Sequence, residues 1–405
     1  MTKQLVVILF CFDCMGCYFS SKKPLITASE TIQMDSLPGE CPYLTKDKED
    51  NTVLSWVRMI NDSTTAFCYA VNKNGKEFSV PVVIPNSGNI QPHGENLPKI
   101  IFKPKGEIIA LWGARSVTAK NKYAGSIFYT QSFNDGKTWT DPRLLVSDTL
   151  SFDQRYYDVA LLADGEVGVI WLDNRKTASS EGSALYFMKS NGSRGFEGNG
   201  TLISQPCCPC CRTKLLVDRN GNIHAIYRGI LENSVRDMVH VVSRDAGKTF
   251  STPERISADN WVINGCPHTG PSMTENEEGI HFAWFTGGKN RGCYYTKSVD
   301  NGKSFTTRDS VSTLGSHPQI TSLPGGDLAI AWDETSSIGD RIIKKIGLQI
   351  RDAKGINQST SFISDANGAS SFPVLSAINY RKMIVAYTSE QNERPYVAYQ
   401  IVTLR

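Results

Sequence analysis

The sequence has no long hydrophobic run, almost no excess of charge of either sign, and no extended helical repeat. Lys and Arg number 43 and Asp and Glu 40 among 405 residues, which gives a net charge of +3. Because no basic run gathers into a patch, we expect no nucleic-acid partner. The absence of sustained heptads excludes coiled coils and helical bundles. Hydrophobic residues are 40% and charged residues 20% of the chain, a composition that favours a large folded core over disorder.

The longest apolar run, Leu5–Phe12, is too short to cross a membrane. Eight apolar residues cannot span a hydrocarbon layer of about 30 Å, but they are typical of the hydrophobic segment of a signal peptide. Gly16 and Cys17 follow, and then a polar stretch. This region resembles a bacterial lipoprotein signal, which implies cleavage before Cys17 and a lipid on its sulfur, although Cys14 stands where leucine is usual.

An ordinary signal peptide is the alternative, and both versions predict an exported protein. The lipoprotein version places the chain in the bacterial cell envelope, at the outer membrane or at a membrane that faces the periplasm, with the lipid as its membrane contact. Export also permits disulfides.

A six-residue strand pattern that ends in an aromatic residue recurs along the chain. Each copy follows a turn rich in Gly, Asp or Asn, and another short strand precedes that turn, so the unit is a β-hairpin. The copies are 48–59 residues apart and end at Trp56, Trp112, Trp171, Tyr227, Trp284, Trp332 and Tyr387. A unit repeated seven times at this spacing indicates a repeat architecture.

A second motif lies between the hairpins. It reads SFNDGKTW at 132–139, SRDAGKTF at 243–250 and SVDNGKSF at 298–305. In each copy the Asp or Asn accepts backbone N–H bonds, the Gly adopts a positive φ, and the last aromatic ring packs between sheets. The motif therefore predicts a repeated tight turn.

These segments match the Asp-box pattern, and the chain from about residue 40 to residue 404 resembles the sialidase superfamily of Asp-box (BNR) β-propellers, including exo-alpha-sialidase-like bacterial lipoproteins. The resemblance implies an all-β protein, a β-propeller of four-stranded blades with the Asp-box turns at the outer rim. Sialidases have six blades. The seven hairpins favour seven blades here, with six as the alternative.

Three regions follow from this interpretation. Residues 1–17 form the signal peptide, 18–40 a linker, and 41–405 a single propeller domain. The last hairpin is followed by a third strand at about 396–402, after which the sequence stops. We therefore expect the segment 25–29 to supply the fourth strand of the last blade, which would protect both edges. We expect a monomer.

The loops before the first strands are expected to converge at one end of the propeller axis, because first strands line the central channel. Three of the six histidines and six of the eleven cysteines fall in these loops. The default site for a glycan or another small ligand is therefore this axial end. The candidate ligand-binding residues are His93, Asn96, Arg155, Arg212, Thr269 and Gln319.

The residues of a sialidase site are only partly matched. The resemblance implies three arginines that hold the sialate carboxylate, because a planar guanidinium binds a carboxylate through two parallel hydrogen bonds. Asn96 stands at the first of these positions, and no aspartate lies at the acid/base position near residues 121–123. The arginines that could rebuild a carboxylate site are Arg155, Arg212, Arg228 and Arg236.

Asp158, Glu95 and Tyr157 are the candidate catalytic residues if the protein is a glycosidase. Glycoside hydrolysis uses two carboxyl groups about 5–10 Å apart, which Asp158 and Glu95 could supply. Tyr157 is the third candidate, and the residues do not assign the family's Tyr–Glu nucleophile pair. In the alternative, Asp158 forms an ion pair with a neighbouring arginine. The sequence leaves open whether the protein is an enzyme.

The segment CCPCC at 207–211 contains two overlapping C-x-x-C pairs, which are compatible with disulfides, a metal site or redox chemistry. Thiolate and imidazole ligands together favour copper or zinc. The metal hypothesis uses Cys207, Cys208, Cys210, Cys211, Cys266, His268 and His317. The disulfide alternative uses the same cysteines and needs no histidine.

Other polar residues of the repeats are interpreted as structural. His224 and His281 occupy equivalent strand positions and are expected to pack, and Arg236 is expected to pair with Asp237. Three classes of function follow. The first is a glycan-active or glycan-binding protein with altered or lost sialic-acid specificity, the second a metalloprotein with an axial His/Cys site, and the third a non-catalytic envelope scaffold.

Overall fold

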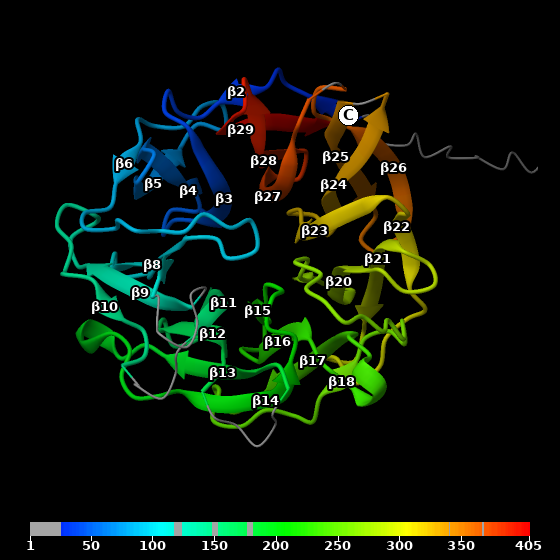
Figure 1. Ribbon diagram of the computed structural model, residues 1–405, viewed down its shortest axis with the longest axis horizontal. Coiled ribbons are helices and arrows are strands. Elements are labelled where there is room, and N and C mark those ends of the chain that lie inside the picture. The colour runs from blue at the N-terminus through cyan, green and yellow to red at the C-terminus, as the bar shows by residue number, and fades with distance from the viewer. Residues whose placement is uncertain (1–25, 117–123, 148–152, 176–180, 340, 367) are drawn as a thin grey trace, which may run out of the picture.

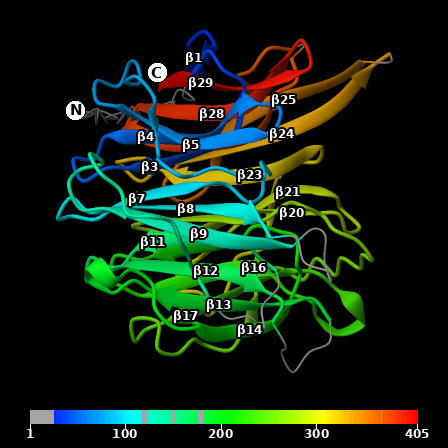
Figure 2. The ribbon, with the colours of Figure 1, turned by 60° about the vertical axis from the view of Figure 1, so that its left-hand side comes forward.

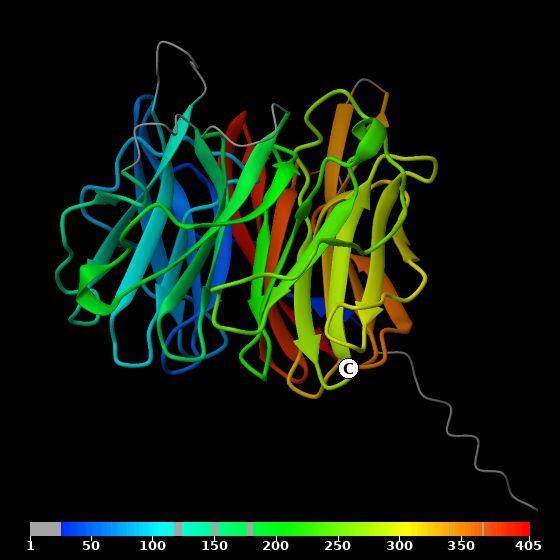
Figure 3. The same ribbon diagram turned by 90° about the horizontal axis from the view of Figure 1, so that it is seen from below.

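Seven antiparallel sheets form a closed ring around a central axis (Figure 1). The computed structural model describes residues 26–116, 124–147, 153–175, 181–339, 341–366 and 368–405. In six blades the four strands follow one another in sequence from the axis to the rim. Seen from the side, the strands run along the axis (Figure 3). The seven-bladed, all-β fold predicted from the hairpin repeat is confirmed.

The first three blades follow one another along the chain. Blade 1 contains β3 (Gly39–Lys46), β4 (Thr52–Asn61), β5 (Thr64–Asn72) and β6 (Val82–Val83). Blade 2 contains β7 (Lys99–Phe102), β8 (Ile108–Arg115), β9 (Gly125–Ser132) and β10 (Arg143–Leu144). Blade 3 contains β11 (Gln154–Leu161), β12 (Val167–Asp173), β13 (Ser183–Lys189) and β14 (Thr201–Cys207).

The next three blades repeat this order. Blade 4 contains β15 (Lys214–Val217), β16 (Ile223–Arg228), β17 (Met238–Ser243) and β18 (Glu254–Arg255). Blade 5 contains β19 (Ser272–Asn276), β20 (Gly279–Thr286), β21 (Gly292–Ser298) and β22 (Asp309–Ser312). Blade 6 contains β23 (Gly315–Ser322), β24 (Leu328–Ile338), β25 (Arg341–Arg351) and β26 (Asn357–Phe362).

Blade 7 is built from both ends of the described chain. It contains β27 (Ser371–Asn379), β28 (Lys382–Gln391), β29 (Arg394–Leu404) and, from the N-terminal side, β1 (Ile26–Ala28). β1 pairs antiparallel with β29, as Figure 2 shows, and β2 (Ile32–Gln33) pairs with β29 farther along. This pairing is the one expected for residues 25–29, and it closes the ring.

The aromatic residue at the end of each hairpin repeat is the centre of the packing between blades. All seven rings are at most 2% exposed. Each lies in an apolar cluster that includes residues of an adjacent blade. Truncation of a buried aromatic of this size costs about 3–5 kcal/mol, so these rings fix the blades to one another.

The three predicted turns share one hydrogen-bond pattern between the third and fourth strands. In the copy at 243–250, Ser243 Oγ accepts the N–H of Gly247 at 2.9 Å, and Asp245 Oδ1 accepts the N–H of Thr249 at 2.9 Å. Gly247 has a φ of 86°, which favours glycine. The copies at 132–139 and 298–305 repeat both bonds.

Bulky residues with a positive φ mark the entry to five first strands. The residues and their φ values are Cys41 (62°), Tyr156 (55°), His268 (50°), His317 (51°) and Phe372 (53°). In blades 1, 3, 6 and 7 the register of the first strand shifts at this residue, which is a β-bulge. A left-handed conformation costs a non-glycine residue about 1–2 kcal/mol, so backbone strain is concentrated at one end of the axis.

The helical part of the described residues consists of two short 3-10 turns, Gly192–Arg194 and Glu232–Ser234. Across this part of the chain, no helix is long and apolar enough to span a membrane. The predicted signal peptide and the lipidation site Cys17 lie outside the described residues.

The closing strand gives a first prediction, for the variant Thr27→Pro. Ser29 N donates to Ile401 O at 2.9 Å, and hydrogen-bonded pairs alternate along an antiparallel ladder, so the N–H of Thr27 faces Thr403. Proline removes this donor, and we expect a loss of about 1–3 kcal/mol in the free energy of unfolding, measured by urea denaturation. Thr27→Val keeps the N–H and is the control. Equal stability of the two variants would contradict a stabilising role for β1.

Candidate functional site

A buried carboxylate, Glu95, joins the loops at the axis. One oxygen of Glu95 accepts from Arg212 Nη1, and the other accepts the backbone N–H groups of Arg212 at 3.1 Å and Gly270 at 2.6 Å. Arg212 Nη2 donates to the carbonyl oxygen of Pro318 at 2.7 Å. The loops before blades 2, 4 and 5 and the first strand of blade 6 therefore meet at one ion pair. Both oxygens of Glu95 therefore have protein partners.

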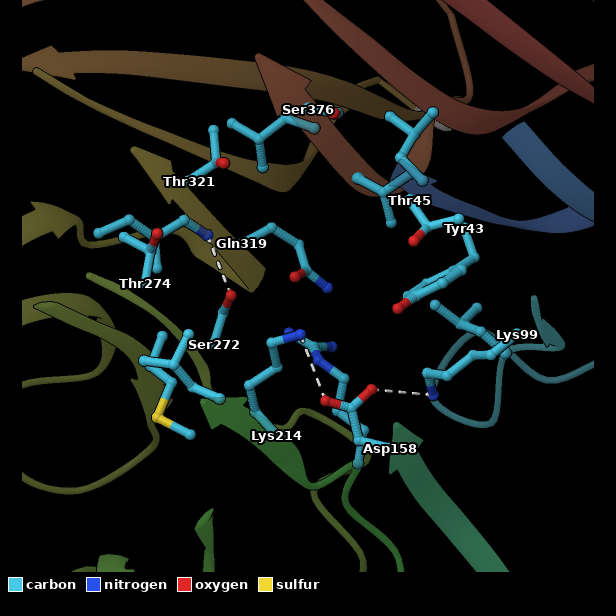
Figure 4. Close-up of a pocket in the computed structure, with 18 of the residues that line it drawn as sticks. Tyr43, Thr45, Lys99, Asp158, Lys214, Ser272, Thr274, Gln319, Thr321 and Ser376 are labelled. Carbon is cyan, nitrogen blue, oxygen red and sulfur yellow. Dashed lines mark hydrogen bonds and ion pairs between the residues drawn. The ribbon is translucent and has the colours of Figure 1, made fainter. Parts of the chain in front are cut away.

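Below this ion pair lies a cavity of about 350 Å³ inside the channel, to which the first strands of all seven blades contribute (Figure 4). Lys99 and Asp158, near the ion pair, are 4% and 2% exposed. Toward the hairpin turns of the opposite face, the side chain of Lys46 is 32% exposed. The residues that line the cavity are therefore buried beside the ion pair and more exposed toward the hairpin turns of the opposite face.

Asp158 forms an ion-pair cluster in the wall of this cavity (Figure 4). Its carboxylate lies 3.6 Å from Lys99 Nζ and 3.2 Å from Lys214 Nζ, and it accepts the N–H of Leu215 at 2.8 Å. Lys99 Nζ also donates to the carbonyl oxygen of Tyr157 at 2.6 Å. The ion pairs expected for Asp158 exist, but with lysines of two blades and not with an arginine. Burial lowers the pKa of Lys99 to about 8, against the opposing effect of Asp158.

The side chains of Tyr157 and Asn96 form hydrogen bonds with backbone groups around the channel. The hydroxyl of Tyr157 is fully buried against the carbonyl oxygens of Leu97, at 2.7 Å, and Leu111, at 2.9 Å. Asn96 Oδ1 accepts the N–H of Tyr156 at 2.8 Å. The ring of Tyr156, and not that of Tyr157, lies on the axial face, 5.7 Å from the ring of His93.

Two more predicted ligand-binding residues lie at opposite sides of the Glu95–Arg212 pair. Thr269 holds the neighbouring loop, because its Oγ1 accepts the N–H of His317 at 3.3 Å and its carbonyl oxygen accepts a bond from Arg228 at 3.0 Å. Gln319 points into the central cavity (Figure 4).

The remaining arginines do not form a carboxylate-binding triad. Arg155 pairs with Asp153 at 2.5 Å. Arg228 is 2% exposed and donates to the backbone carbonyl oxygens of three residues in the neighbouring loops and strands. Arg236 donates to Cys208 Sγ at 3.3 Å, and Asp237 pairs with Arg255 instead, so the expected Arg236–Asp237 pair is wrong.

The eight cysteines of the described residues are free thiols, and they fall into different environments. The sulfur atoms of Cys208, Cys210 and Cys211 all lie within 4.8 Å of one another. The ligand atoms of Cys210, Cys266 and His268 form a second such group. Hydrogen bonds from the thiols of Cys210 and Cys211 lower the pKa of Cys208. Cys207 faces elsewhere, since its Sγ contacts Ser204 O at 3.5 Å.

The three axial histidines have separate partners. The ring of His93 lies 5.4 Å from the ring of His268, at the edge of the thiol groups. His317 Nδ1 lies 2.8 Å from Asp333 Oδ2. Although burial alone would lower it, the Asp333 carboxylate raises the pKa of His317 above its usual value. His224 and His281 are fully buried and hydrogen-bonded within their blades.

Sequence reasoning missed the cationic side chains of the site. Lys99 and Lys214 stand at the start of first strands, where alternation places every second side chain in the channel. This signal was present in the sequence for both lysines. No sequence pattern predicts the contact of Arg236 with Cys208. Arg236 lies in the loop before β17 and Cys208 in the segment before β15, so the two residues are distant in the sequence.

Comparison with known proteins finds solved structures with a similar fold and low sequence identity. No protein-family model matches the chain, and no curated protein matches it. A protein of unknown function from Dyadobacter fermentans DSM 18053 is 16% identical, with a TM-score of 0.55 over 94% of this chain and 99% of that chain. The intramolecular trans-sialidase from Ruminococcus gnavus is 11% identical, with a TM-score of 0.53 over 78% and 95%. The polysaccharide lyase Uly1 is 12% identical, with a TM-score of 0.55 over 91% and 90%. The fold is therefore a sialidase-like propeller, and these identities show the fold alone.

Proposed function

We propose that the protein binds a carbohydrate with one acidic group in its central cavity and lacks sialidase specificity. The observation that carries this proposal is a set of polar side chains that line the cavity and have no hydrogen-bond partner among the described residues. They are Thr45, Gln319, Thr321 and Ser376 (Figure 4). Hydroxyl and amide groups that converge from several strands match the hydroxyls of a sugar, which donate and accept in turn.

The charge of the cavity favours an acidic ligand. Lys99 and Lys214 face the single carboxylate of Asp158, which leaves one excess positive charge. The other charged groups at the cavity are paired, Arg212 with Glu95 and Lys46 with Asp50. A carboxylate or sulfate on the ligand would offset the excess, and a charge-assisted hydrogen bond is worth about 1.5–3 kcal/mol.

The size of the cavity supports a short ligand. About 350 Å³ is near the lower end of the range of roughly 300–1,000 Å³ for ligand pockets, which suits one or two sugar units at the end of a chain. The shared fold adds general support, since a trans-sialidase and a polysaccharide lyase are among the proteins that have it.

Lys99 gives the test of this proposal. We expect glucuronic acid to bind and glucose to bind more weakly in calorimetric titrations, and Lys99→Met to weaken glucuronic acid binding roughly 10- to 150-fold. Affinity for the acid should fall as pH rises through about 8, because Lys99 loses its proton there. Lys105→Met, in an exposed turn of the same blade, is the matched control. Equal affinity for the two sugars at neutral pH would refute an acid-selective cavity.

Sialoside cleavage gives a second test. Asn96 replaces the first expected arginine, and the loss of one charge-assisted contact of about 2–3 kcal/mol slows turnover roughly 30- to 150-fold before any acid/base defect. Arg155, Arg212, Arg228 and Arg236 are all engaged elsewhere. We therefore expect negligible release of the reporter group from a sialoside substrate. A turnover near the ordinary enzyme value of about 10 per second would contradict lost specificity.

We also propose that the protein is exported and lipid-anchored through Cys17. The support is the apolar run Leu5–Phe12 followed by Gly16 and Cys17. Expression in a bacterium with labelled palmitate should label the wild-type chain, and Cys17→Ser should remove the label. Cys266→Ser, at an exposed cysteine far from the signal, is the control. A labelled Cys17→Ser chain, or an unlabelled wild type cleaved at another residue, would favour an ordinary signal peptide.

A further inference from the structure

The thiol groups on the axial face lie on the side of the Glu95–Arg212 pair opposite to the central cavity, and the proposed carbohydrate function does not use them. Three thiols, those of Cys208, Cys210 and Cys211, are 1%, 4% and 1% exposed, and all come from the segment between β14 and β15. Their sulfur atoms lie within 4.8 Å of one another, with 3.5 Å between Cys208 and Cys210.

This spacing is close to that of thiolates on one metal ion. Two sulfur atoms bound to zinc at about 2.3 Å in a tetrahedral arrangement lie about 3.8 Å apart. A disulfide requires about 2.05 Å, so the three thiols need a much smaller movement to bind an ion than Cys208 and Cys210 need to form a disulfide.

A second loop brings two more ligand atoms to the same place. Cys266 and His268 belong to the segment between β18 and β19, and their ligand atoms lie within 4.8 Å of each other and of Cys210 Sγ. Both residues are exposed, whereas the three clustered thiols are buried, so the second loop provides the path by which an ion would enter. The five donor atoms are sulfur and imidazole nitrogen. This set favours zinc or copper(I) over cations that prefer oxygen ligands, such as magnesium and calcium.

Buried contacts at Arg212 and Gly270 fix the two loops relative to each other. Arg212 follows Cys211 directly, and Gly270 is two residues after His268. A Cβ on Gly270 would lie 2.2 Å from Arg212 Cγ, so only glycine permits this approach, and the carboxylate of Glu95 accepts the backbone N–H groups of both residues. The ligand atoms are thus held in place by residues that are not ligands.

Arg236 supplies the charge that such a centre requires. Its Nη1 donates to Cys208 Sγ at 3.3 Å and to the carbonyl oxygen of Gly265, one residue before Cys266, at 3.1 Å. A zinc ion with three thiolates and one imidazole carries one net negative charge, which the guanidinium offsets. Arg236 therefore touches both ligand-bearing loops and complements the charge of a filled site.

We propose that Cys208, Cys210 and Cys211, with a fourth ligand from Cys266 or His268, bind one soft d10 cation, zinc or copper(I). Cys210 belongs to both groups of ligand atoms. Two residues of the sequence hypothesis are not part of the site, because Cys207 faces Ser204 and His317 faces Asp333.

The experiment uses the whole chain, purified without chelator under reducing conditions, with zinc and copper measured per chain. We expect about one ion per chain in the wild type and in Cys207→Ala, the adjacent control. Cys210→Ser should lose the ion. Cys266→Ser and His268→Ala, both at exposed positions, should be tested alone and combined, and the combined variant should lose the ion.

Two further measurements identify the ion and test the role of Arg236. Cobalt(II) added to metal-free protein should give sulfur-to-cobalt charge-transfer absorption, and a copper(I) chelator should remove copper but not zinc. Arg236→Met should weaken metal binding roughly 10- to 100-fold, as loss of an outer partner does. A metal-free wild type with the axial cysteines oxidised in pairs by mass spectrometry would overturn the proposal. Retention of the ion by Cys210→Ser, or its loss in Cys207→Ala, would overturn the ligand assignment.

Discussion

The arrangement of both candidate sites depends on one buried ion pair. Glu95 and Arg212 come from different blades, and each also binds backbone groups of a further blade. Removal of one partner from such a pair costs about 3–5 kcal/mol, because the other charge stays buried without a counterion. The pair therefore locks three entry loops and the start of β23 into one arrangement, and the positions of the thiols on one side and the lysines on the other follow from that arrangement.

The same pair divides the axis into two chemically different compartments. On the loop side, sulfur and imidazole donors gather beside the guanidinium of Arg236. On the channel side, Lys99, Lys214 and Asp158 line a polar cavity. A metal ion in the first compartment and a sugar in the second would not touch. The two proposals can therefore be tested independently of each other.

The fold was predictable because it repeats. Seven hairpins that each end in a buried aromatic residue determine the number of blades, and the missing fourth strand of the last blade pointed to residues 25–29. The convergence of loops at the axis followed as well. The direction in which single side chains point could not be predicted. A bulge at the entry of a first strand breaks the in–out alternation on which such a prediction depends. The hydroxyl of Tyr157 is buried against backbone carbonyl oxygens, while the ring of the preceding Tyr156 lies beside His93. Cys207 and Cys208 also have different surroundings although they are neighbours in the sequence.

The strained entry positions have a consequence for how such a protein changes over evolutionary time. Cys41, Tyr156, His268, His317 and Phe372 share a left-handed backbone and place side chains of four kinds around one axis. The backbone conformation at each position is imposed by the surrounding strands and loops. A substitution there changes the chemistry offered at the axis while the sheets that carry it keep their register. A propeller of this kind can acquire or lose a sulfur, an imidazole or an aromatic ring one blade at a time without a change of architecture.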